Sequence, residues 1–457
     1  IAAHLANIGI PTLLLDIVPN ELTEAEKAKG LSLSNKAVRN RLANEAIQKL
    51  FKQNPAPLTK KENAGLITAG NLEDDLEKLA QVDWIIEVVV ENLEVKKQVF
   101  EKVDAHRKPG TIVSSNTSGI SVEAMSEGRS DDFKKYFLGT HFFNPPRYLK
   151  LLEIIPTKAT LPEVVDYMKT FGEDVLGKGV VEAKDTPNFI GNRIGTFGLL
   201  QTARVMLEDG YTISEVDSVT GTLIGRAKSA TFRTLDVVGL DTFYHVANNV
   251  YNNVEGEEKE QFALPEFMKK MVDKGLLGSK TKQGFFKKDG KEILQLNPET
   301  LEYEPRQKLQ APSIEMAKQA KRSERLKTLV YADDRAGQLL WKTMVPSFLY
   351  AAEKVGEIAD NLYAIDQAMK WGFGWEQGPF ESWDAIGLEK SIAKMEEEGR
   401  MVPQWVKDML AAGHTSFYKK ETGKLHYFHN GTYVAVPENP KVIHLATVKQ
   451  EKEVVKK

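Results

Sequence analysis

Cysteine is absent from the 457 residues of this chain. The absence excludes a disulfide framework, a thiolate metal site and a thiol nucleophile, and it fits a reducing compartment, so we expect a cytoplasmic protein that holds no metal. No apolar run approaches the length of a membrane-spanning helix, and we expect no membrane partner. A formal net charge of −3 offers no basic surface, so we expect no nucleic-acid partner.

The composition that remains is that of an ordinary globular protein. Hydrophobic residues make up 42% of the chain and charged residues 27%, and the length fits two to four domains. The opening residues, IAAHLANIG, lack the basic region and cleavage site of a signal peptide. They instead indicate the latter part of a helix that ends at Gly9, so we expect that a segment preceding Ile1 is missing.

The first part of the chain alternates between apolar runs and helical patterns. The apolar run IPTLLLD, which begins at Ile10, predicts a buried strand that ends at Asp16. Six further runs predict strands at 66–68, 84–90, 111–114, 136–143, 151–155 and 178–182. Helical patterns occupy 23–52, 93–106 and 121–126. This alternation predicts an α/β domain with a Rossmann-type, doubly wound sheet over residues 1–183.

The rest of the chain is helical in pattern and contains an internal repeat. Residues 216–241, VDSVTGTLIGRAKSATFRTLDVVGLD, correspond to residues 365–389, IDQAMKWGFGWEQGPFESWDAIGLE. The matched positions are Asp217 with Asp366, Gly225 with Gly374, Phe232 with Phe380, Asp236 with Asp384, and Gly239 with Gly387. We predict two duplicated all-α domains, 184–312 and 313–440, followed by a linker or tail at 441–457.

Each predicted helical domain closes on a hairpin. FFKKDGK (285–291) corresponds to FYKKETGK (417–424), and Asn430-Gly431 predicts a type I′ turn.

Two segments of the first domain carry residues suited to binding a dinucleotide. Asp16 ends the strand that would be second in a dinucleotide-binding fold, where a carboxylate accepts hydrogen bonds from the adenosine ribose and repels a 2′-phosphate. That position favours NAD, although a simple loop carboxylate is an equal alternative. Ser115 lies in SSNTSG (114–119), directly after a buried strand, where α/β folds bind ligands; the alternative is a run of helix N-caps.

The segment GTHFFNPPRYLKLLEIIP (139–156) is the most informative. His141 ends an apolar run, Asn144 and two prolines follow it, and Glu153 interrupts the next apolar run. A carboxylate in such a strand needs a partner, and a carboxylate bonded to an imidazole makes a general base. The alternative is a structural histidine. Asn192 in DTPNFIGNR (185–193) would lie on the first helix of the second domain, or simply on a polar helix surface.

Together these segments resemble the 3-hydroxyacyl-CoA dehydrogenase family. The resemblance rests on HFFNPPRYLKLLEII, SSNTSG, DTPNFIGNR and EVVVENLEVKKQVF (87–100), and extends strongly to about residue 300. It implies NAD-dependent oxidation of (S)-3-hydroxyacyl-CoA in fatty-acid β-oxidation. His141 would take the proton of the 3-hydroxyl, Glu153 would orient His141, and Ser115 and Asn192 would hydrogen-bond the substrate oxygen.

The resemblance also implies cofactor and CoA contacts. Asp16, Glu87 and Asn92 would lie near the ribose groups, and Ser115 and Asn144 on the nicotinamide side. Basic residues of the 23–52 segment could meet CoA phosphates, foremost Lys36 and Arg39, unless that segment is a solvated helical face. An enoyl-CoA hydratase module and a thiolase, fused or associated, are the implied partners, and a homo-oligomer is the implied assembly.

Three features depart from the family pattern. The strand and glycine loop that bind the pyrophosphate do not precede Ile1, so we expect this chain by itself to bind NAD poorly. GRAKSATF (225–232) replaces a Gly-Pro-Phe step that the second copy keeps at 378–380. Trp341 stands in the second copy where the first has Asn192, so we expect that copy to be structural. A dehydrogenase of another small hydroxy acid and a non-catalytic scaffold stay open as alternatives.

Overall fold

The computed structural model describes residues 1–421 and 423–441 and divides into two compact units, Ile1–Asp185 and Thr186–Lys457. The division falls close to the predicted domain boundary after residue 183. No helix among the described residues is both long enough and apolar enough to cross a membrane. The predicted tail, 441–457, lies outside the described residues except for Lys441.

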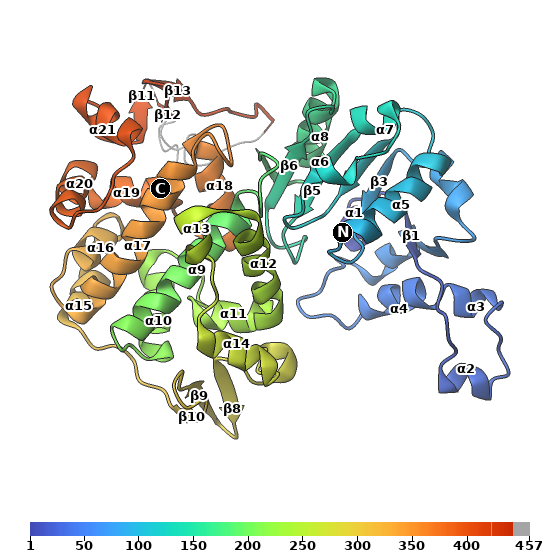
Figure 1. Cartoon of the computed structure of the whole chain (residues 1–457), viewed down its shortest axis with the longest axis horizontal. Coiled ribbons are helices and arrows are strands. Elements are labelled where there is room, and N and C mark those ends of the chain that lie inside the picture. Colours follow the sequence, from blue (N-terminus) through green and yellow to red (C-terminus); the bar gives the residue numbers. More distant parts are fainter. Residues whose placement is uncertain (422, 442–457) are drawn as a thin grey trace, which may run out of the picture. The chain divides into compact units, whose positions relative to one another are not determined.

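The first unit contains a five-stranded sheet and a separate two-stranded sheet (Figure 1). The larger sheet has the order β3 (Trp84–Glu87), β4 (Ile112–Ser115), β5 (Phe137–Phe142), β6 (Leu151–Pro156), β7 (Gly179–Glu182). The smaller pairs β1 (Thr12–Asp16) with β2 (Ile67–Asn71) in parallel. Every strand predicted from an apolar run is present in this unit.

Helices of the first unit connect these strands. They are α1 (Ala2–Asn7), α2 (Glu24–Ala28), α3 (Lys36–Arg39), α4 (Arg41–Lys49), α5 (Leu93–His106), α6 (Val122–Met125), α7 (Asp131–Lys135) and α8 (Pro162–Asp174). The single helical stretch predicted at 23–52 is in fact three short helices. A capping side chain explains the break between α2 and α3, because Asn35 accepts a hydrogen bond from the N–H of Ala37 in the first turn of α3.

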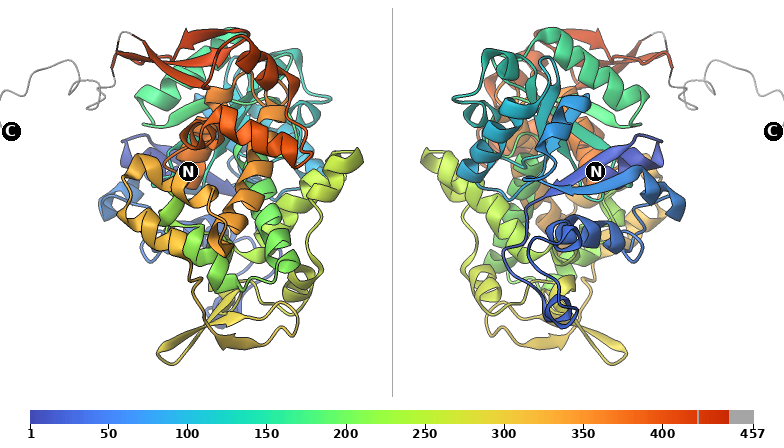
Figure 2. Two further views of the ribbon diagram at one scale, coloured as in Figure 1. Left: turned by 90° about the vertical axis from the view of Figure 1, so that its left-hand side faces the viewer. Right: turned by 90° about the vertical axis from the view of Figure 1, so that its right-hand side faces the viewer.

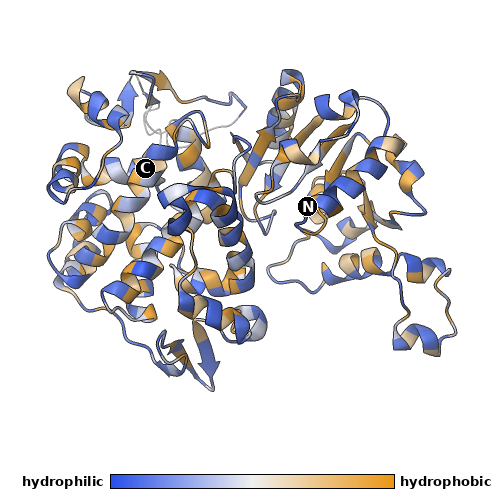
Figure 3. Ribbon diagram, in the orientation of Figure 1, coloured by the Kyte–Doolittle hydropathy of each residue, from blue (hydrophilic) through white to orange (hydrophobic). Residues whose placement is uncertain are grey.

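Two strands of the larger sheet, β6 and β7, run against the other three. β5 pairs with β4 in parallel but with β6 in antiparallel, and β6 is again parallel to β7. The connection from β5 to β6, residues 143–150, is too short for the crossover that a parallel pair requires. β5 and β6 are buried along almost their whole length, and β6 is mainly hydrophobic in Figure 3, so this pair forms the centre of the unit's core.

The second unit is largely helical, and each of its halves ends in a small three-stranded sheet. The first half contains α9 (Gly191–Glu208), α10 (Ile213–Val219), α11 (Phe232–Val238), α12 (Leu240–Asn253), α13 (Gly256–Gln261), α14 (Glu266–Asp273), β8 (Phe286–Asp289), β9 (Glu292–Leu296) and β10 (Tyr303–Pro305). The second half contains α15 (Pro312–Gln319), α16 (Arg322–Val330), α17 (Arg335–Lys354), α18 (Leu362–Phe373), α19 (Pro379–Ile386), α20 (Leu388–Glu397), α21 (Gln404–Ala411), β11 (Tyr418–Glu421), β12 (Lys424–His429) and β13 (Thr432–Ala435).

Matched aspartates make the same contacts in the two halves. Asp217 accepts hydrogen bonds from the backbone N–H groups that begin α11, and Asp366 does the same for α19. Asp236 and Asp384 each accept two backbone hydrogen bonds from the start of their hairpins, at 2.8–3.0 Å. Equal contacts at repeated positions support our proposal that the two halves arose by duplication.

The long helices α9 and α17 lie side by side and join the halves (Figures 1 and 2). Phe197 of α9 stacks on Tyr350 of α17 with ring centroids 4.1 Å apart. Arg193, which is fully buried, donates to the Tyr350 hydroxyl and to Glu258, both at 2.6 Å. Trp341 is buried and donates to Glu398 at 2.9 Å, which fits the structural role expected of the second copy.

The predicted turn in the last hairpin is confirmed. Asn430 and Gly431 both have positive φ, 47° and 85°, as a type I′ turn between β12 and β13 requires.

Asp236→Asn is expected to change how stability depends on pH. Burial raises the pKa of Asp236 to about 6 from an ordinary 3.8, while the backbone N–H groups of Phe285 and Phe286 oppose the shift. The folded protein therefore keeps a proton that the unfolded chain has released. The free energy of unfolding should fall as pH rises from about 4 to about 6, and the asparagine variant should lack this component.

Urea denaturation of both proteins across that pH range measures the effect. Asp289→Asn, at the exposed tip of the β8–β9 hairpin, is the matched control. A difference between parent and Asp236→Asn that stays constant with pH would contradict the assignment.

Candidate active site

The candidate site lies at the edge of the large sheet where β3, β4 and β5 end. The parallel register pairs Glu87 with Ser115, so the last residues of β3 and β4 are neighbours. The antiparallel register pairs His141 directly with Glu153. Cross-strand partners project from the same face of a sheet, so these two pairings alone bring four of the predicted site residues into contact with a partner.

His141 and Glu153 form a buried hydrogen-bonded pair. The distance from His141 Nδ1 to Glu153 Oε2 is 2.6 Å, and Glu153 is fully buried. The His141 ring also contacts the Phe143 ring, with centroids 4.7 Å apart. A carboxylate on Nδ1 fixes the orientation and tautomer of the ring, so Nε2 is the nitrogen that could exchange a proton with a ligand.

Glu87 is the centre of a second buried network. It accepts the Ser115 hydroxyl at 2.5 Å, the ammonium of Lys96 at 2.8 Å and the backbone N–H of Val89 at 2.6 Å. Lys96, on α5, is only 1% exposed. Sequence reasoning missed Lys96, because its neighbours in EVKKQ are ordinary helix-surface residues; the only signal was a charged Glu87 within an apolar strand.

Glu91 extends this network toward the SSNTSG segment. It accepts the Thr117 hydroxyl at 2.5 Å and the Ser118 N–H at 2.9 Å, and lies 3.2 Å from Lys96. Asn92 is exposed and caps α5 by accepting the N–H of Val95 at 3.1 Å. The structure therefore gives Asn92 a capping contact, and its proposed position near a ribose stays a prediction.

Polar side chains also connect the ends of neighbouring strands. Asn116 accepts the backbone N–H of Phe142 at 2.9 Å, beside His141. Ser114 accepts hydrogen bonds from Trp84 on β3 and Thr140 on β5. These contacts link β3, β4 and β5 through side chains as well as through the backbone. Asn144 follows β5 in an exposed position on the loop to β6.

Asp16 ends β1, half-buried, and accepts the N–H of Ile17 at 2.7 Å. Exposed apolar side chains lie near the strand ends: Ile17 is 61% exposed, Val88 59% and Val90 68%. A carboxylate can accept hydrogen bonds from the hydroxyl groups of a ribose, and exposed apolar side chains can pack against flat aromatic rings. Both kinds of group lie at the carboxyl ends of parallel strands here. In that respect the residues present fit NAD.

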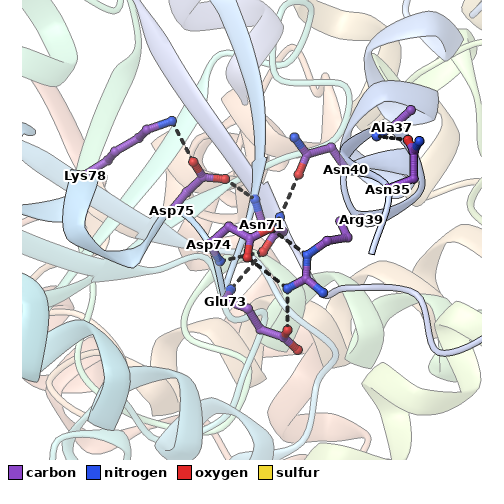
Figure 4. A network of polar contacts seen from close by, with 9 residues as sticks. All are labelled: Asn35, Ala37, Arg39, Asn40, Asn71, Glu73, Asp74, Asp75 and Lys78. Atoms are coloured by element: carbon purple, nitrogen blue, oxygen red, sulfur yellow. Dashed lines mark hydrogen bonds and ion pairs between the residues drawn. The ribbon is translucent and has the colours of Figure 1, made fainter. Parts of the chain in front are cut away.

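The predicted CoA-binding residues line a shallow cleft beside this region. Its volume is about 460 Å³, and Lys36 and Arg39 lie on its wall. Arg39 is bound by two carboxylates, Glu73 and Asp74, each at 2.7 Å (Figure 4). Hydrogen bonds from Arg39 lower the pKa of Asp74 to about 2. Lys36 is exposed and forms no ion pair in the described part of the chain.

Asn71 connects residues that line the cleft. It is buried at the end of β2, next to Asp16 in the strand register, and its amide contacts Asn40 and Asp74 (Figure 4). This network fixes α3, which carries Lys36, against the end of β2.

Asn192 lies in the second unit, half-buried on the first turn of α9. Its proposed contact with the substrate stays a prediction. Among residues 1–421 and 423–441, no cluster of three or more histidine or acidic side chains is arranged to hold a metal ion.

Lys96→Met is expected to destabilise the fold strongly. Removal of the ammonium leaves the buried Glu87 carboxylate without its charge partner, which typically costs about 3–5 kcal/mol of the free energy of unfolding. The double variant Lys96→Met/Glu87→Gln should recover part of that loss. Denaturant unfolding of the parent and the two variants measures both effects.

The adjacent lysine supplies the control. Lys97 pairs with the exposed Glu127 at 2.8 Å, and Lys97→Met should leave the free energy of unfolding almost unchanged. Equal losses for the two lysines would show that the Lys96–Glu87 pair has no special place in the fold.

Comparison with known proteins identifies the family of the chain. Residues 1–186 match the family model of the 3-hydroxyacyl-CoA dehydrogenase NAD-binding domain, and residues 189–288 match that of the C-terminal domain. The chain is 63% identical over 458 aligned positions to a Bacillus subtilis protein named "Probable 3-hydroxyacyl-CoA dehydrogenase"; the match covers all of this chain and 58% of that protein. A Deinococcus radiodurans protein of the same name is 48% identical, with 63% of this chain and 79% of that protein covered.

Two further relatives extend the comparison. A "Putative fatty acid oxidation complex trifunctional enzyme" of Rickettsia felis is 32% identical over 83% of this chain and 50% of its own length. The crystal structure of Escherichia coli 3-hydroxybutyryl-CoA dehydrogenase shares the fold, with a TM-score of 0.63 at 20% identity, over 90% of this chain and 96% of that one. The chain thus spans little more than half the length of the Bacillus relative. These matches show that the chain belongs to the 3-hydroxyacyl-CoA dehydrogenase family.

Proposed function

We propose that the protein oxidises (S)-3-hydroxyacyl-CoA to 3-oxoacyl-CoA in fatty-acid β-oxidation, with His141 as the general base. The buried His141–Glu153 pair carries this proposal, because a histidine held by a carboxylate is the group that can take the proton of a hydroxyl near neutral pH. NAD, when bound, accepts the hydride from C3. His141 takes the hydroxyl proton, and Glu153 stabilises the resulting imidazolium.

Ser115 is proposed to bind the substrate oxygen, and the family resemblance gives Asn192 the same role. The Ser115 hydroxyl donates to Glu87, and its oxygen accepts the N–H of Thr117 at 3.1 Å. Because the single proton of the substrate hydroxyl goes to His141, Ser115 would contact the substrate oxygen as a donor. To donate to the product ketone, the hydroxyl has to rotate away from Glu87. Lys96 and the N–H of Val89 would keep the Glu87 carboxylate paired during that rotation.

NAD contacts are proposed for Asp16 at the adenosine ribose, for Asn92 near a cofactor ribose, and for Ser115 and Asn144 on the nicotinamide side. Glu87 is proposed to lie near a ribose and to act on the cofactor site through Ser115. Of these, Asp16 bears on the choice of cofactor, since its carboxylate repels a 2′-phosphate. Glu87 acts through Ser115 in this arrangement, because its side chain is buried behind that residue.

CoA phosphates are proposed to meet Lys36 first. Its ammonium is exposed on the wall of the cleft, whereas Arg39 uses Nε and Nη2 to bind Asp74 and Glu73. Arg39 therefore holds α3 in place and could offer only Nη1 to a phosphate. The likeness to trifunctional proteins supports an enoyl-CoA hydratase module, fused or associated, as a partner.

Substitution of the base pair tests the proposal. His141→Gln and Glu153→Gln should each lower kcat by about 10²-fold or more with little change in NAD affinity, because both remove proton transfer and neither contacts the adenosine half of NAD. The assay is NADH formation from 3-hydroxyacyl-CoA by the full-length protein, with NAD affinity measured by calorimetry.

His106→Gln is the matched control, since His106 is half-buried and the hydrogen bond found for its ring among the described residues is with the carbonyl of Lys102 on its own helix. A parent that binds NAD and turns over no acyl-CoA would reject the substrate class in favour of another hydroxy acid or a scaffold. An active His141→Gln would reject the base.

Asp16→Ser is expected to relax the preference for NAD. The variant loses a charged acceptor for the ribose and the repulsion of a 2′-phosphate, so kcat/KM for NAD should fall about tenfold while that for NADP rises. Steady-state kinetics with both cofactors measures the ratio. Asp83→Ser, exposed just before β3, is the control, and an unchanged ratio in Asp16→Ser would refute the placement.

A further inference from the structure

The loop that joins the strands of His141 and Glu153 contains a single helical turn. The N–H groups of Tyr148 and Leu149 both donate to the carbonyl oxygen of Pro145, at 2.9 and 3.0 Å. A single turn cannot satisfy the carbonyl groups at its own end, so these need donors from elsewhere.

Lys178, the residue before β7, supplies those donors. Its ammonium donates to the carbonyl oxygens of Pro146 and Leu149, the latter at 3.0 Å. No other donor to either oxygen is found within residues 1–421 and 423–441. The same ammonium lies 5.6 Å from the ring centroid of Phe142, the residue after His141.

The position of Lys178 links the loop between β5 and β6 to β7. Lys178 directly precedes β7, and the N–H of Gly179 donates to the carbonyl of Lys150, the last residue of the loop. β7 in turn pairs with β6, where Val181 is the register partner of Glu153. Lys178 thus contacts the loop and Phe142 of β5, and it is joined directly to β7, the strand that pairs with β6.

Burying a lysine ammonium lowers the stability of the fold unless the charge forms hydrogen bonds or an ion pair. Lys178 is 5% exposed and has no carboxylate within ion-pair distance among the described residues, and burial lowers the pKa of its ammonium to about 8. A methionine would fill the same space without desolvating a charge. What only the lysine provides is a pair of charge-assisted hydrogen bonds to the end of the turn.

We propose that Lys178 is a positioning residue of the dehydrogenase site, which holds the turn at residues 145–149 and thereby sets the place of Asn144 and of the adjoining end of β5. This inference rests on the proposed function. The opposite side of the turn is fastened to the segment after α4, where Arg147 donates to the carbonyls of Ala56 and Leu58. The turn is therefore held at two places, by the buried Lys178 and by Arg147.

Lys178→Met tests the proposal by a split between kinetic constants. We expect kcat to fall and KM for NAD to rise, each about tenfold, because Asn144 and the nicotinamide side shift. KM for 3-hydroxyacyl-CoA should stay within about twofold, and the thermal midpoint should change little, because removal of the buried charge offsets the two carbonyls left without a donor. Lys169→Met on α8, which removes an exposed ion pair with Glu182, is the matched control.

The outcomes separate the inference from the proposed function. A parent without activity rejects the proposed function, whereas an active parent and a folded Lys178→Met with unchanged kcat and KM for NAD reject only the role of Lys178. If Lys178→Met does not fold, Lys178→Gln tests the role of Lys178 instead. The glutamine amide can still donate a hydrogen bond, but its shorter side chain cannot reach both carbonyl oxygens as the ammonium does. A folded Lys178→Gln with the parent's kinetics overturns the proposal, and one with lower kcat and higher KM for NAD supports it.

Discussion

The antiparallel pairing of β5 with β6 is the constraint on which the site depends. The eight-residue loop between the strands forces the second strand to run back along the first, and the register then sets Glu153 opposite His141. A buried carboxylate needs a partner, and a buried histidine needs a fixed orientation; each supplies what the other requires. The contact that stabilises the centre of the sheet is thus also the contact that would make the base.

The same principle recurs along this edge of the sheet. Glu87 is buried with Lys96, and Lys178 is buried against backbone carbonyls, so each charged group is held in one geometry by partners from another element. Since water cannot replace a lost partner in these positions, small changes in one element are transmitted to the next. That rigidity suits a site which must hold a hydroxyl between a base and a hydride acceptor.

Sequence reasoning reached the strands and the base pair because both leave a local signal. Apolar runs predicted each strand of the first unit, and a glutamate inside one of them pointed to His141. Lys96 and Lys178 left no such signal, since a lysine in a helix or before a strand is ordinarily solvated; burial by distant elements decides their roles. Arg39 was predicted as free for phosphates, but its carboxylate partners lie some 35 residues further along the chain.

The most direct test of the account is a crystal structure of the protein with NADH and a 3-oxoacyl-CoA. The account predicts the 3-oxo oxygen within hydrogen-bond reach of His141 Nε2, roughly 2.6–3.2 Å, with Nδ1 still bound to Glu153. A 3-oxo group held away from His141, or a His141 ring turned away from Glu153 in the complex, would contradict it.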